Sequence, residues 1–84
     1  MMTLIWVTKA EYVSDYKINF TFNTGEEVIV NLEQYLDDGI FLKLKKKDYF
    51  RNFKLNSWTV EWENGADFSP EFLYSLKPDK ELIL

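Results

Sequence analysis

The sequence contains no cysteine and no histidine, and these two absences narrow the chemistry open to its 84 residues. Without cysteine there are no disulfides and no thiolate zinc sites. Without histidine there is no imidazole for general acid–base catalysis, and Ser-His and Cys-His nucleophile systems are excluded. Most enzymes of this size would need one of these groups. We therefore expect a protein that is not an enzyme and that has no cofactor, metal or catalytic residues.

Long apolar runs are also missing. No stretch approaches the roughly 18 consecutive apolar residues that would suggest a membrane span. The first nine residues contain a short apolar run, without the basic lead-in and small-residue cleavage site of a signal peptide. We expect a soluble protein with no membrane partner. The reducing cytoplasm is the default location for a chain without disulfides.

Glycine and proline are scarce, with three and two residues, and each occurs singly, as expected of turns and of the ends of helices and strands. With no linker, repeat or low-complexity tract, residues 1–84 should form a single domain. That length is near the limit at which one core offsets the entropy of ordering. The aromatic content of 18% compensates, since large rings bury much area per residue. A compact fold without disulfides is therefore credible.

Alternating side chains predict three strands in the first half of the chain. Residues 4–13 are rich in β-branched and aromatic types, although their alternation breaks near residues 9–11. Residues 18–23 alternate cleanly between apolar and polar, which is the signature of a half-buried strand. Gly25 provides the positive φ of a tight hairpin turn, after which residues 27–32 return as the third strand.

Two short helical turns are expected in the middle of the chain. Asn31 with Gln34 resembles a capping box, and Gly39 should end the first turn in a left-handed conformation. A second turn is expected at residues 48–52. The residues expected to anchor the intervening segment in the core are Ile40, Phe41 and Leu44.

The last third of the chain predicts two strands and a helix. Residues 53–56 and 58–62 form a second antiparallel pair, in which Trp58, Val60 and Trp62 share an apolar face. Asn64-Gly65 is a strong turn dipeptide. Ser69 caps a helix whose first residue is Pro70, with Phe68 and Leu73 spaced as a hydrophobic staple.

The predicted class is therefore α+β, with a small and mainly antiparallel sheet: three strands, two short helical turns, two strands and a C-terminal helix. The final segment, residues 79–84, either adds a strand or serves as a binding tail. The sequence does not rank these two alternatives.

A family resemblance is carried by the same stretch. The pattern of Val60 and Trp62, then Asn64-Gly65-Ala66-Asp67, then Pro70-Glu71, then Leu73-Tyr74 resembles the small bacterial family catalogued as domain of unknown function 2442, DUF2442. Upstream it extends through Phe22 to Gly25 with Glu26, Gly39-Ile40-Phe41, Leu44 and Phe50. It covers residues 4–76, leaving residues 77–84 as a tail or extra strand. Glu63 departs from the pattern, because the family often has proline at this position.

The resemblance implies a compact α+β domain. It also implies a standalone bacterial or mobile-element protein, in some members joined to a helix-turn-helix, with an antitoxin-like or regulatory role and no established chemistry.

The charge distribution is two-sided. Residues 43–54, here named the basic segment, carry a net charge of +5, whereas the rest of the chain carries −9. A basic patch attracts nucleic-acid phosphates or an acidic protein. The chain has a single arginine, Arg51, and therefore few bidentate hydrogen bonds to offer to bases and phosphates. An acidic protein partner is thus favoured over nucleic acid. A merely solvated face is the alternative.

The surplus of aromatic residues points to a binding surface, since Trp6 and the five tyrosines cannot all enter so small a core. Tyr49, among the cations of the basic segment, is the best candidate, with packing on lysine stems as the alternative. Trp6 on a sheet edge would allow a homodimer. The candidate partner-binding residues are Lys45, Lys46, Lys47, Tyr49, Arg51, Asn64, Asp67 and Tyr74.

The acidic residues give little support for a metal or catalytic site. The adjacent pairs at residues 26–27 and 37–38 lack the spaced oxygens of a calcium loop. For Asp67, hydrogen bonds from backbone groups of its own turn are the favoured role.

Together these observations favour a non-enzymatic binding module that acts through protein–protein contact. The alternative from another class is a nucleic-acid-associated regulator that uses the basic segment, with Tyr49 as a stacking ring. A weak third hypothesis is a small hydrolase that uses Asp38 or Asp67.

Overall fold

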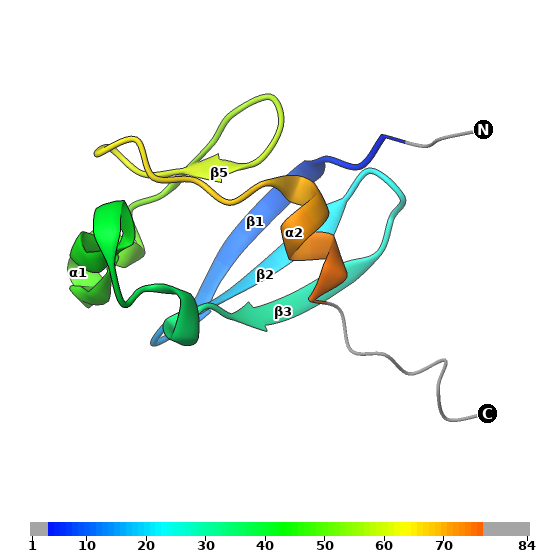
Figure 1. Cartoon of the computed structure of the whole chain (residues 1–84). Helices are drawn as coiled ribbons and strands as arrows, with labels where there is room; N and C mark the ends of the chain where they lie inside the picture. Colours follow the sequence, from blue (N-terminus) through cyan, green and yellow to red (C-terminus); the bar gives the residue numbers. More distant parts are fainter. Residues whose placement is uncertain (1–3, 77–84) are drawn as a thin grey trace.

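The computed structural model describes residues 4–76, and Figure 1 shows their arrangement. The alternatives stated for residues 79–84 lie outside this range. The elements follow the order β1 (Val7–Ser14), β2 (Lys17–Phe22), β3 (Glu27–Asn31), η1 (Glu33–Tyr35), η2 (Gly39–Lys45), α1 (Lys47–Phe50), β4 (Lys54–Leu55), β5 (Val60–Glu61) and α2 (Pro70–Ser75), where η marks a 3₁₀-helix. The predicted α+β class is confirmed. No helix in this part of the chain is long and apolar enough to cross a membrane.

Strands β1, β2 and β3 form an antiparallel sheet in that order, and their alternation explains why one face is buried. Phe20 pairs with Val28 and Ile18 with Val30, and all four side chains are buried. The pairing of β1 with β2 shifts its register between Val7 and Lys9, and this shift marks a β-bulge. This bulge accounts for the broken alternation in the sequence, because an inserted residue reverses the faces that follow it.

The middle of the chain differs from the prediction. The expected first helix is the single 3₁₀ turn η1, which has no side-chain cap; Asn31 accepts a 3.0 Å hydrogen bond from the N–H of Glu33 instead. Gly39 does have a positive φ, +61°, but it begins η2 rather than ending η1. Of the expected anchors, Leu44 is buried and Phe41 half-buried, whereas Ile40 is 47% exposed. In a 3₁₀-helix residues three apart share a face, which pairs Phe41 with Leu44 and leaves Ile40 outside.

The second sheet is shorter than expected, and this changes the position of one tryptophan. Strand β5 contains only Val60 and Glu61, so Trp58 lies in the preceding loop with 49% of its surface exposed. The side-chain oxygen of Asn56 accepts hydrogen bonds from the N–H groups of Trp58 and Thr59, both 2.7 Å, and folds this loop back. The predicted apolar face therefore consists of Val60 and Trp62 alone.

The C-terminal helix begins as predicted. Ser69 caps α2 by accepting a hydrogen bond from the N–H of Phe72 at 3.1 Å, and Pro70 is the first helical residue. Phe68 and Leu73 are both buried, as the hydrophobic staple requires. In Figure 1, α2 lies across one face of the three-stranded sheet, α1 lies at one end of that sheet, and β5 runs along its top.

Candidate functional site

The basic segment is partly neutralised by the molecule itself. Lys45 donates a 3.0 Å hydrogen bond to the carboxylate of Asp37, and Lys47 donates one of the same length to Asp15. A further pair joins Arg51 to Asp48 at 3.8 Å. All these side chains are exposed, so each pair contributes little stability and is open to exchange with a partner.

The ionisation of two of these groups is shifted by their contact. The hydrogen bond from Lys47, followed by its positive charge, holds the pKa of the Asp15 carboxyl below its usual value of 3.8. The same contact raises the pKa of Lys47 above 10.5. In the same way, the hydrogen bond to Asp37 raises the pKa of Lys45. These lysines are therefore cations throughout the physiological pH range.

Tyr49 is half-buried, and a lysine lies over its ring. The ammonium of Lys43 lies 5.0 Å from the centre of the Tyr49 ring, and the Tyr49 hydroxyl accepts a 2.8 Å hydrogen bond from the backbone N–H of Asn64. The Tyr49 ring is thus in contact with the charged end of a lysine, whereas the alternative considered from the sequence was packing on lysine stems. The four lysines nearest to it nevertheless gather around one open hollow of about 770 Å³, lined by Tyr16, Lys43, Lys45, Lys46, Lys47, Asp48, Tyr49 and Asn52.

Asn64 uses its polar groups inside the molecule. Its side-chain amide donates to the carbonyl of Ile40 at 3.0 Å, and its side-chain oxygen accepts from the N–H of Ala66 at 3.1 Å. With the bond to Tyr49, these contacts hold the turn after β5 against η2 and α1. Asn64 was a candidate partner-binding residue, and in this structure it fixes the turn.

Two other candidates, Tyr74 and Asp67, lie apart from the basic segment. The hydroxyl of Tyr74 donates a 2.5 Å hydrogen bond to Glu26, and its ring meets that of Phe22 edge-on at 5.2 Å, so it links α2 to the β2–β3 hairpin. Asp67 was expected to accept backbone hydrogen bonds in its turn. Within residues 4–76 its carboxylate accepts none, because Asn64 satisfies the turn instead, and Asp67 remains exposed.

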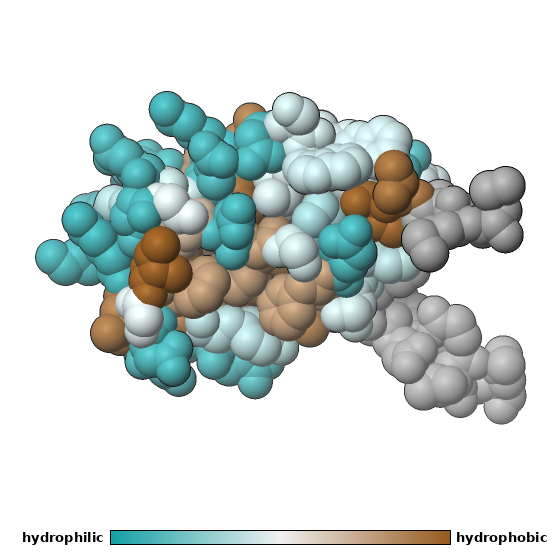
Figure 2. All heavy atoms as spheres, turned by 45° about the horizontal axis from the view of Figure 1, so that its top comes forward, coloured by the Kyte–Doolittle hydropathy of each residue, from teal (hydrophilic) through white to brown (hydrophobic). Residues whose placement is uncertain are grey.

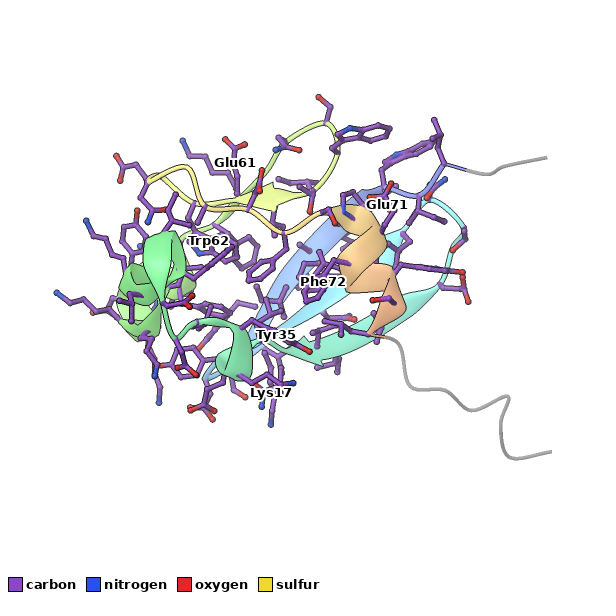
Figure 3. All side chains as sticks on the ribbon, in the orientation of Figure 1. Lys17, Tyr35, Glu61, Trp62, Glu71 and Phe72 are labelled. Atoms are coloured by element: carbon purple, nitrogen blue, oxygen red, sulfur yellow. The ribbon has the colours of Figure 1, made fainter. Side chains whose placement is uncertain are left out.

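A second surface, which we name the aromatic hollow, joins segments that are far apart in the sequence. It has a volume of about 360 Å³. In Figure 3, Tyr35 of η1 and Phe72 of α2 lie close together on the face turned to the reader. Figure 2 shows hydrophobic side chains across the middle of the molecule with hydrophilic ones around them. The lining residues are Tyr35, Asp38, Phe41, Asp67, Phe68, Ser69 and Phe72.

Four rings of the hollow form a continuous row. Tyr35 meets Phe72 edge-on at 5.1 Å between ring centres, Phe72 stacks on Phe68 at 5.8 Å, and Phe68 stacks on Phe41 at 4.8 Å. Phe68 is buried, whereas the other three rings are half-buried and keep part of their surface in solvent. The buried hydroxyl of Thr59 donates a 2.7 Å hydrogen bond to the carbonyl of Phe68 and fixes the middle of the row.

Local structure explains why Tyr35 and Phe72 keep part of their surface exposed. In the 3₁₀ turn η1, Leu32 and Leu36 on either side are buried in the core, whereas Tyr35 packs against the core with part of its ring exposed. The Ser69 cap sets the start of α2 and so the direction of Phe72. The rings come from three segments of the chain: η1, η2 and the stretch that starts α2. Sequence reasoning therefore missed the hollow, although the surplus of aromatic residues indicated that some ring surface had to remain exposed.

The remaining sequence expectations concern metal ligands and the sheet edge. Within the described residues, no group of three or more acidic side chains is arranged to hold a metal ion. Trp6 precedes β1 rather than lying in it; its N–H and carbonyl both bond to Asn23 at 2.9 Å, and its ring lies 5.7 Å from that of Trp58. Trp6 is therefore engaged within the molecule, directly before the edge strand β1.

Comparison with known proteins gives one match. The family model described as "Protein of unknown function (DUF2442)" matches residues 7–79. No curated protein and no solved structure matches the chain. The family match confirms the resemblance stated above from the pattern around Trp62, Gly65 and Pro70.

Proposed function

The chain belongs to the DUF2442 family, and on this premise we propose that it is a small binding module that contacts a partner protein through the aromatic hollow. The observation that carries the proposal is the row of four rings, three of which keep exposed surface. Aromatic side chains are enriched among the residues that contribute most to protein–protein affinity. An antitoxin-like or regulatory role in a bacterial cytoplasm belongs to the same proposal and rests on the family resemblance.

Binding is favoured over catalysis for this hollow. Asp38 and Asp67, named separately in the hydrolase hypothesis, both line it. Both carboxylates are exposed to water, and no residue in the range 4–76 hydrogen-bonds or ion-pairs with them. Catalytic carboxylates are normally tuned by burial or by a charged neighbour. An exposed acid at the rim of an apolar surface is better suited to binding a partner of opposite charge.

The experiment uses two matched tyrosines. The tagged chain captures proteins from its source cell with nuclease present, and each captured protein is then purified and titrated against the chain by calorimetry. Tyr35→Ala removes a half-buried ring inside the hollow, and Tyr12→Ala removes a half-buried ring outside it. We expect Tyr35→Ala to weaken binding about tenfold or more and Tyr12→Ala to leave it nearly unchanged.

Two results would contradict the proposal. Equal affinity of the wild type and Tyr35→Ala, with both variants folded by circular dichroism, would exclude the hollow as the contact surface. Loss of all captured material on nuclease treatment would exclude direct protein binding and move the function to the basic segment.

A second candidate function, nucleic-acid association, is favoured by the four lysines around the 770 Å³ hollow. It is weaker, because Arg51 is the single arginine of the chain and because the Lys43 ammonium lies over the ring of Tyr49, the expected stacking ring. Its test is the replacement of Lys45, Lys46 and Lys47 by Glu. We expect the wild type to bind DNA or RNA with an affinity that falls steeply with salt, and this variant to lose that binding. A wild type that binds neither DNA nor RNA would contradict the hypothesis.

A further inference from the structure

The aspartates of the described chain divide into two groups by their contacts. The three outside the aromatic hollow are each paired with a cation: Asp15 with Lys47, Asp37 with Lys45 and Asp48 with Arg51. The two that line the hollow, Asp38 and Asp67, have no cation within salt-bridge distance among residues 4–76. Two carboxylates that no cation within residues 4–76 neutralises therefore lie beside the rings of the hollow.

The rings beside these carboxylates add to the same preference. Aromatic faces carry negative electrostatic potential, and a cation within about 6 Å of a ring centre is attracted to it. Tyr35 and Phe72 stand at 86° to each other, whereas Phe72 and Phe68 lie at 16°, so the hollow has ring surfaces in two directions. A cation placed here meets both ring surface and carboxylate.

No residue that lines the hollow is basic, so its own lining does not supply a cation. The molecule uses the same kind of contact elsewhere, where the Lys43 ammonium lies 5.0 Å over the ring of Tyr49. The volume of about 360 Å³ is at the lower end of the range of small-ligand sites, about 300–1,000 Å³, and suits one long side chain.

We infer that the aromatic hollow receives a cationic side chain, arginine or lysine, from a partner protein, with its charge between Asp38 and Asp67 and its apolar stem against Phe41 and Phe72. This inference rests on the proposed function and names the chemistry of the partner at that site. The planar guanidinium of arginine fits both the ring faces and a carboxylate fork, and the lysine stem covers apolar surface.

The test uses three blocked tripeptides that differ only in the central side chain: acetyl-Gly-Arg-Gly-amide, acetyl-Gly-Lys-Gly-amide and the uncharged acetyl-Gly-norleucine-Gly-amide. Each is titrated into the isotope-labelled full chain, and amide shifts are followed by NMR. We expect the cationic peptides to shift amides around Tyr35, Phe41 and Phe72, and to bind about fivefold more tightly than the norleucine peptide.

Charge-removing variants separate the carboxylates of the hollow from general electrostatics. Asp38→Asn and Asp67→Asn should each lower the affinity for the cationic peptides about threefold and leave the affinity for the norleucine peptide unchanged. Asp48→Asn removes an exposed carboxylate outside the hollow and should change the binding of neither kind of peptide. Raised salt should weaken the cationic peptides alone, because exposed charges are screened.

The outcomes distinguish this inference from the proposed function. Equal affinities for the arginine, lysine and norleucine peptides, no shifts at the hollow with any peptide, or an equal effect of Asp48→Asn and Asp67→Asn would each overturn the inference. The proposed function would still stand if Tyr35→Ala weakened the affinity for the purified partner protein, since the hollow would then bind that partner through apolar contacts. It fails separately if Tyr35→Ala has no effect on that partner.

Discussion

The hydroxyl of Tyr49 accepts a 2.8 Å hydrogen bond from the backbone N–H of Asn64, fifteen residues further along the chain. The bond joins α1 to the turn after β5. Both residues are candidates for partner contact on sequence grounds, and in the structure they contact each other. A polar group that is exposed in the sequence pattern can thus be used internally once the chain folds.

Replacing Tyr49 with phenylalanine should test this link. The variant keeps the ring under Lys43 and removes the acceptor of the Asn64 N–H, which is partly buried. We expect the free energy of unfolding to fall by about 1 kcal/mol, measured by urea denaturation. Tyr12→Phe removes an exposed hydroxyl that bonds to the carbonyl of Asp15, and it should cost less. An equal loss of unfolding free energy in both variants would show that the Tyr49 hydrogen bond stabilises the fold no more than the exposed one.

The Ser69 cap links stability to the shape of the aromatic hollow. Ser69→Ala removes the acceptor for the N–H of Phe72 at the start of α2, and we expect a loss of about 1 kcal/mol in urea denaturation. Ser69→Asp supplies another side-chain acceptor and should keep most of the stability. Ser75→Ala, near the end of the same helix, is the control. A Ser69→Ala variant as stable as the wild type would contradict the cap.

Gly65 should resist substitution for reasons of backbone conformation. Its φ is +90°, a value that residues with a side chain rarely adopt. An added Cβ would meet only the Cδ1 atom of Ile40 at 3.9 Å, which is an ordinary contact, so the cost is conformational and not steric. We expect Gly65→Ala to lower the free energy of unfolding by about 1 kcal/mol or more. Thermal unfolding of the two proteins would show it, and equal midpoints would refute it.

The pair of Asp15 and Lys47 should make stability depend on pH. Because the pKa of Asp15 is lowered in the folded state, its stabilisation is complete above the usual value of 3.8 and is lost as pH falls through the folded pKa. For Lys47, whose pKa is raised, the stabilisation is complete below the usual 10.5 and is lost as pH rises through the folded pKa.

The variant Asp15→Asn tests this dependence. Asparagine suits the left-handed backbone at this position, where φ is +46°, so the turn should be kept. Urea denaturation from neutral to about pH 2 should show a shallower fall in stability for the variant than for the wild type. Added salt should reduce the difference, since both groups are exposed. Parallel curves for the two proteins would mean that the pair does not contribute.

Much of the fold was predictable because its signals are local. The alternation of residues 18–23, the Asn64-Gly65 turn and the Ser69-Pro70 helix start each depend on neighbours within a few positions, and each was confirmed. The failures have local causes as well. Ile40 was placed in the core from its hydrophobicity alone, and the 3₁₀ geometry of η2, which the sequence did not signal, turned it outward.

By itself, the sequence determined the α+β class, the three strands of the first half, the family and the lack of imidazole and thiol chemistry, because these follow from residue type and short-range spacing. Only the tertiary structure decided which exposed groups are already engaged and which are left to bind. Tyr49 is hydrogen-bonded to Asn64, and Asp38 lines the same hollow as Asp67. Both relationships join segments that are far apart in the sequence. Such contacts depend on the packing of the whole core, which no single stretch of sequence specifies.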